Sequence, residues 1–70
     1  MNILTNQDKI TIINQHKKNL GYSKYGFEIS VIEENASFSP NTERLNLLDS
    51  QIKEIDAKIQ ALDNEINLLS

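Results

Sequence analysis

The chain has 70 residues, no cysteine and a formal net charge of −3. This length allows a single domain with little buried surface, and the lack of cysteine excludes disulfides and thiolate metal sites as means of stabilising it. The weakly acidic balance argues against a dedicated nucleic-acid-binding domain, which is normally basic. A partner chain is therefore the stabilising device that we expect.

Residues 1–5 are expected to form a loose lead-in, without the basic region and apolar run of a signal peptide. Thr5 and Asp8 stand three residues apart, approximating a capping box with Asp in place of Glu. This predicts a long helix over about residues 6–36. Its first stripe of apolar residues has Lys17 and Lys24 in the gaps and consists of Ile10, Ile13, Leu20, Phe27 and Val31.

A second stripe on the same helix also has helical spacing: Tyr22, Tyr25, Ile29, Ile32 and Ala36. Together the two stripes predict a broad apolar face that packs against the rest of the fold, with the tyrosine hydroxyls in water.

Gly21 and Gly26 disfavour a continuous helix, because each costs about 1 kcal/mol relative to alanine. The alternative is a helix that ends at Gly21, followed by a strand over residues 27–31, where apolar and polar residues alternate. We prefer the continuous helix, because the second stripe persists to Ala36 and the sequence offers no partner strand.

The segment around residues 37–39 is the expected turn. Ser39 is a favoured N-cap and Pro40 a favoured first helical residue, which predicts a second helix over about 40–69. A short connection between helices of nearly equal length makes them antiparallel. The expected fold is all-α: one domain over residues 1–70, a two-helix hairpin that oligomerises into a helical bundle. Glu33 is expected near Arg44 beside the turn.

Apolar residues in the second helix recur at alternating spacings of three and four, which is the pattern of a coiled coil. This seam is the predicted oligomer interface and comprises Leu45, Leu48, Ile52, Ile55, Ile59, Leu62, Ile66 and Leu69. Flanking charges favour a parallel contact between copies, since Arg44 would meet Asp49 and Lys58 would meet Asp63. A homodimer of hairpins with four helices is the preferred state. The alternatives are a trimer with six helices and a monomer whose seam is filled by its own first helix.

The sequence does not indicate catalysis. His16 has no neighbouring base, nucleophile or orienting group, and Glu33 and Glu34 point about 100° apart on a helix. Nucleotide-binding and hydrolase motifs are missing from the 70 residues. We therefore expect no enzyme, no catalytic or metal-binding residues and no cofactor. No apolar run approaches 18 residues, so we expect no membrane partner.

A second hypothesis concerns the lysines of the first helix: Lys9, Lys17, Lys18 and Lys24. With Tyr22 and Tyr25 nearby, they could bind nucleic acid or a host protein and make the chain a small regulatory adaptor. A solvated helix face has the same composition, so nucleic acid is not the preferred partner.

The run Gln15–Ala36, which contains YSKYGFEISVIEENA, is followed by a Pro-started heptad helix, and this arrangement resembles short uncharacterised coiled-coil proteins encoded by tailed phages of marine cyanobacteria. The resemblance covers most of the chain, although the two glycines depart from it. No activity is assigned to those proteins, so no functional residues carry over. The resemblance implies a small accessory or structural protein, cytoplasmic or associated with a virion, that binds itself and docks onto a larger protein assembly.

Overall fold

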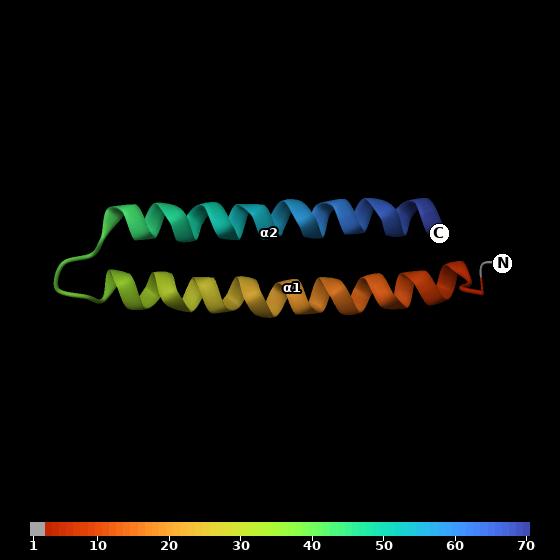
Figure 1. Ribbon diagram of the computed structural model, residues 1–70, viewed down its shortest axis with the longest axis horizontal. Helices are drawn as coiled ribbons and strands as arrows, with labels where there is room; N and C mark the ends of the chain where they lie inside the picture. The colour runs from red at the N-terminus through yellow and green to blue at the C-terminus, as the bar shows by residue number, and fades with distance from the viewer. Residues whose placement is uncertain (1–2) are drawn as a thin grey trace.

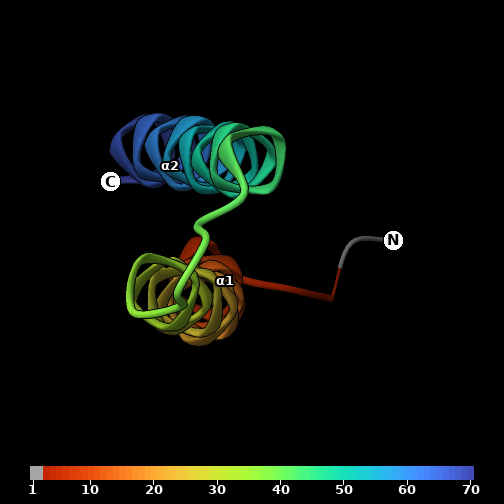
Figure 2. The ribbon, with the colours of Figure 1, turned by 90° about the vertical axis from the view of Figure 1, so that its left-hand side faces the viewer.

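The computed structural model describes residues 3–70 and consists of two long helices side by side (Figure 1). Helix α1 spans Asn6–Asn35 and helix α2 spans Thr42–Leu69. They run antiparallel and form a rod of 57 × 18 × 15 Å, with the start of α1 and the end of α2 at one end and the connecting turn at the other. Viewed along the rod, the turn steps directly from one helix to the other (Figure 2). The predicted all-α hairpin is confirmed.

Helix α1 begins where the capping box predicts. The Thr5 hydroxyl accepts a hydrogen bond from the Asp8 backbone N–H at 3.0 Å, and the Asp8 carboxylate accepts one from the Thr5 N–H at 3.0 Å. Two of the helix's unsatisfied N–H groups are thereby paired. Of the expected loose lead-in, residues 3–5 lie outside any helix, and residues 1–2 lie outside the described part of the chain.

Helix α1 continues without interruption through Gly21 and Gly26, so the alternative with a strand over residues 27–31 is wrong. The surroundings of the two glycines do not require glycine: a Cβ built at either position would meet nothing within 4 Å. Each glycine therefore costs the helix about 1 kcal/mol relative to alanine, and no close packing within the chain offsets that cost.

The turn differs in detail from the prediction. Asn41, and not Ser39, is the N-cap of α2, and its side-chain oxygen accepts a hydrogen bond from the Arg44 N–H at 3.0 Å. Pro40 thus lies in the turn and not at the first helical position. Asn41 is as good a cap as serine, and its own backbone N–H donates to the Glu34 carboxylate at 3.4 Å, which ties the cap to the end of α1.

Polar contacts at both ends of the rod fix how the two helices are aligned. Next to the turn, Arg44 contacts Glu34 at 3.2 Å. Glu33 lies near Arg44 as predicted, since both line one surface pocket, but the ion pair forms with Glu34, because a single step along α1 turns a side chain by about 100°. At the far end, the Asn6 side chain donates to the Leu69 carbonyl at 3.3 Å and pairs one of the last free carbonyls of α2.

The core between the helices is very small. Among the described residues, the buried side chains are those of Leu48 and Ile55, which are 5% and 7% exposed. The residues of the first stripe lie opposite them on α1 and are half-buried. Each fully buried aliphatic side chain contributes roughly 1.5–3 kcal/mol before conformational entropy is counted. The single hairpin therefore has few such contributions to offset the ordering of its chain.

Candidate interaction surfaces

The seam of α2 faces α1 within the same chain. Leu48 and Ile55 are buried there, and the other six seam residues are half-buried. The structure thus gives the predicted oligomer interface an intramolecular partner, the first stripe of α1. Because most of the seam keeps an open edge, α1 alone does not cover it completely.

Two ion pairs run along one flank of this contact. Lys17 pairs with Asp63, and Lys24 pairs with Asp56 at 2.7 Å. Lys24 follows Lys17 by seven residues in α1, and Asp56 precedes Asp63 by seven residues in α2. This opposite order is the one that antiparallel heptads require. The two lysines fill the gaps of the first stripe. Both lysines are half-buried and their ammonium groups reach the aspartates, as is usual for a lysine that covers apolar surface with its stem. We call these two pairs the lysine–aspartate ladder.

The ladder changes the interpretation of the charges beside the seam. The sequence predicts that Asp63 meets Lys58 of another copy, but Asp63 pairs with Lys17, and Lys58 lies 3.5 Å from Glu54 in its own helix. Arg44, predicted to meet Asp49 of another copy, instead contacts Glu34. The charges that favour a parallel contact between copies of α2 therefore have partners inside the chain.

The pairing of Lys24 with Asp56 in the ladder also shifts the pKa of Lys24. The hydrogen bond to Asp56 is the largest influence on Lys24 and raises its pKa above the ordinary value of 10.5. Desolvation comes second and opposes the rise, and the negative charges of Asp56 and Glu28 add smaller increases in the pKa. A raised pKa in the folded state means that the stabilisation is complete below pH 10.5 and is lost as the pH rises through the higher value.

We expect a ¹³C NMR titration of the lysine Cε atoms to place the pKa of Lys24 above 10.5 and Asp56→Asn to return it toward that value. Lys53 offers a matched control, because its hydrogen bond to Asp49 in the preceding turn of α2 also raises its pKa. Asp49→Asn should lower the pKa of Lys53 and leave that of Lys24 unchanged. A Lys24 that titrates identically in the wild type and in Asp56→Asn would contradict the ladder.

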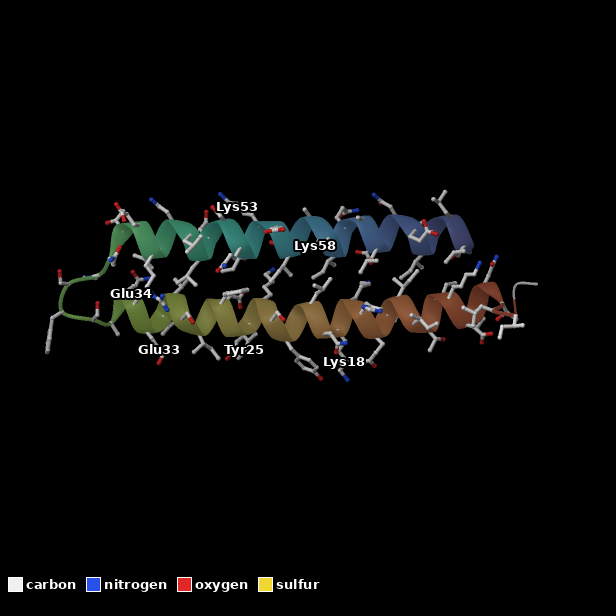
Figure 3. All side chains as sticks on the ribbon, in the orientation of Figure 1. Lys18, Tyr25, Glu33, Glu34, Lys53 and Lys58 are labelled. Carbon is white, nitrogen blue, oxygen red and sulfur yellow. The ribbon has the colours of Figure 1, made fainter. Side chains whose placement is uncertain are left out.

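The second stripe does not join the core. Tyr22, Tyr25 and Ile32 are 64%, 62% and 64% exposed, and Ile29 is 40% exposed. Figure 3 shows Tyr25 pointing away from α2, on the same side of α1 as Lys18 and Glu33. The expectation that both stripes form one face against α2 is therefore wrong. At 3.6 residues per turn the two stripes lie about 140° apart, so one straight neighbouring helix contacts only one of them.

Charged groups border the second stripe at each end. Lys18 lies with its ammonium group 5.9 Å from the centre of the Tyr22 ring, within the range of a cation–π contact. Glu33 lies near the other end and is exposed. The stripe thus has a basic end toward the N-terminus of α1 and an acidic end toward the turn.

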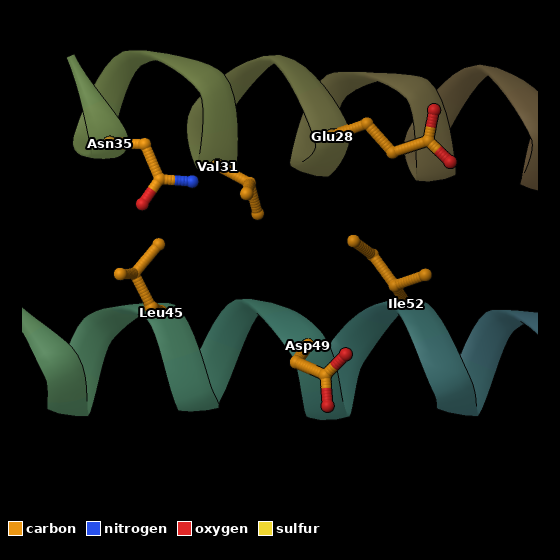
Figure 4. A pocket seen from close by; sticks show the side chains of 6 residues that line it. All are labelled: Glu28, Val31, Asn35, Leu45, Asp49 and Ile52. Atoms are coloured by element: carbon orange, nitrogen blue, oxygen red, sulfur yellow. The ribbon is translucent and has the colours of Figure 1, made fainter.

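A shallow groove of about 350 Å³ opens between the helices near the turn. Val31, Leu45 and Ile52 point into it, and Glu28, Asn35 and Asp49 complete its lining (Figure 4). Its position follows from the ladder: one heptad beyond Lys24, the residue opposite Asp49 is Val31. The shorter valine leaves space that a third lysine stem would occupy, so the groove is an imperfection in helix packing.

The residues considered for chemistry remain apart from one another. His16 is exposed on α1, Glu34 contacts Arg44, and Glu33 is exposed on the side of α1 away from α2. Within residues 3–70, no group of three or more histidine, aspartate or glutamate side chains is placed to hold a metal ion. Neither helix has an apolar stretch long enough to cross a membrane over the described residues.

Comparison with protein-family models, with curated proteins and with solved structures finds no match to this chain.

Proposed function

We propose that this protein is a small structural or interaction protein that associates with itself and does not catalyse a reaction. One observation carries the proposal. Within residues 3–70 the hairpin buries two side chains, whereas many large apolar side chains are exposed: Ile3, Leu4, Ile12, Tyr22, Tyr25, Ile29, Ile32, Phe38, Leu47 and Leu68. Four of these residues, Tyr22, Tyr25, Ile29 and Ile32, follow one another at helical spacing on α1. A contiguous exposed apolar stripe on a small protein marks an interaction site, whereas singly scattered apolar residues do not.

Self-association is also the simplest remedy for a core of this size. A fold of 70 residues without disulfides has few other means of gaining stability. A second hairpin would cover either the open edge of the seam, which would form a bundle of four helices, or the exposed second stripe on the other side of α1. A dimer is the smallest assembly that does this.

The adaptor hypothesis gains no support from the lysines of α1. Lys17 and Lys24 are engaged by Asp63 and Asp56, which leaves Lys9 and Lys18 as the lysines of α1 not in the ladder. Nucleic-acid affinity comes mainly from cations that neutralise phosphates, and each neighbouring aspartate opposes that attraction. We therefore prefer a protein partner.

The resemblance of the run Gln15–Ala36 and the heptad helix after it to short phage-encoded coiled-coil proteins supports an accessory role in the cytoplasm or on a virion, docked onto a larger assembly. That part of the proposal rests on the resemblance alone. Affinity capture with the tagged chain, followed by mass spectrometry, tests it. Phage structural proteins that bind the wild type, and not a variant with altered exposed residues such as Tyr25→Glu, would support the role.

The test of self-association is a dilution series that combines light scattering with circular dichroism. We expect a mass of about twice the 8.0 kDa of one chain at micromolar concentration, with helicity falling as dilution dissociates the assembly. An 8.0 kDa species that remains fully helical throughout the series would overturn the proposal.

A further inference from the structure

We propose that the second stripe of α1 binds the second stripe of another copy of this chain, with the two α1 helices antiparallel. This inference rests on the proposed self-association and specifies its surface and orientation. It moves the contact between copies away from the seam of α2, which α1 already occupies, to the face on the far side of α1.

The charges at the ends of the stripe select both the occupant and its direction. Lys18 and Glu33 lie on one side of α1, separated by about 22 Å at 1.5 Å per residue. An antiparallel copy places Lys18 of each chain near Glu33 of the other, so one patch makes the attractive contact twice. A parallel copy would oppose lysine to lysine and glutamate to glutamate. The stripe is therefore complementary to itself in the antiparallel direction, as a two-fold interface requires.

The two glycines of α1 provide a second observation. At helical spacing Gly21 lies on one flank of the second stripe and Gly26 on the other. Neither is needed for packing inside the chain, because a Cβ at either site meets nothing within 4 Å. Side-chain-free flanks allow a neighbouring backbone to approach closely. In an antiparallel pair centred near Tyr25, the ring of each Tyr25 would lie over the partner's Gly26 region.

The available area suits a reversible dimer. Tyr22 and Tyr25 are 64% and 62% exposed. Since an aromatic side chain buries about 150–250 Å², the four rings of two copies would remove roughly 500 Å² from water. A specific interface needs about 1,000 Å² in total, so Ile29, Ile32 and the closely approaching backbones must supply the rest. This is a small interface, and we expect association that depends on concentration over the micromolar range.

The experiment compares two exposed apolar residues of similar accessibility. Ile32 is 64% exposed in the second stripe, and Leu47 is 59% exposed on α2. We expect Ile32→Glu to raise the dimer Kd, measured by sedimentation equilibrium, by about tenfold or more, and Leu47→Glu to change it by less than about twofold. Circular dichroism at matched concentrations keeps the comparison valid, because both positions are exposed in the single hairpin and both variants should fold.

A charge exchange tests the orientation. Lys18→Glu should weaken the dimer, because the carboxylate introduced at position 18 of each copy then faces the partner's Glu33. Adding Glu33→Lys to the same chain should restore the dimer, since the two charges are then exchanged and attract again. In a parallel dimer Lys18→Glu would replace one like-charge contact with another and leave Kd unchanged.

The outcomes separate the two proposals. A wild type that stays monomeric overturns self-association itself. A wild type that dimerises, with Ile32→Glu no weaker than Leu47→Glu, retains self-association and overturns the second stripe as its surface. Weakening by Ile32→Glu without any effect of Lys18→Glu retains the surface and overturns the antiparallel orientation.

Discussion

Leu48→Ala should unfold most of the hairpin, whereas Leu47→Ala should leave it folded. The two leucines are neighbours in α2, but Leu48 is 5% exposed and Leu47 is 59% exposed. Truncating a buried leucine costs about 2–5 kcal/mol, through lost burial and the cavity that remains. A hairpin that buries two side chains within residues 3–70 cannot absorb that loss, because a fold of this size is marginal from the start.

The pair of variants is informative because the chemical change is identical. Both place alanine in a helix, where alanine is the most favourable residue, so helix propensity does not explain a difference between them. Far-ultraviolet circular dichroism during urea titration, at one fixed protein concentration, measures the free energy of unfolding. If Leu47→Ala proved as destabilising as Leu48→Ala, the assignment of α2's packing face would be incorrect.

Reversing the charges of the ladder should produce the second large effect. Asp56→Lys combined with Asp63→Lys sets two new ammonium groups against Lys17 and Lys24, which now pair with these aspartates. Like charges at close range along a partly buried contact oppose the antiparallel alignment. We expect the thermal midpoint at low ionic strength to fall by several degrees or more, and part of the loss to return in high salt, which screens such repulsion.

The chain contains its own control for this experiment. Asp49 continues the same heptad series as Asp56 and Asp63, but the residue opposite it is Val31, and its ionic partner is Lys53 of the same helix at 2.9 Å. Asp49→Lys should therefore destabilise the hairpin far less than either ladder reversal. Adding Lys17→Asp and Lys24→Asp to the double reversal should restore the thermal midpoint. Failure of that rescue would show that the ladder does not set the alignment.

The sequence predicts the apolar stripe that forms the candidate interaction surface, but it does not predict that this stripe is exposed. The spacing of Tyr22, Tyr25, Ile29 and Ile32 predicts a helical stripe, and that spacing matches the structure. The same spacing does not say which stripe of a helix faces its neighbour. Lys17 and Lys24 interrupt the first stripe, so the second stripe has the more continuous apolar character, yet the first stripe is the one that packs against α2.

The sequence by itself determined the elements and their order. The Thr5–Asp8 box positions the start of α1, the heptads carry α2 to Leu69, and a short turn between equal helices makes them antiparallel, because capping, periodicity and loop length are local properties of the chain. The facing surfaces and the ion pairs depended on the tertiary structure. Lys17 can lie beside an apolar contact because its charge pairs with Asp63. Asp63 is 46 residues away in sequence but adjacent in space. Only the alignment of the two helices brings that carboxylate within reach, and the same alignment leaves the tyrosine face of α1 exposed.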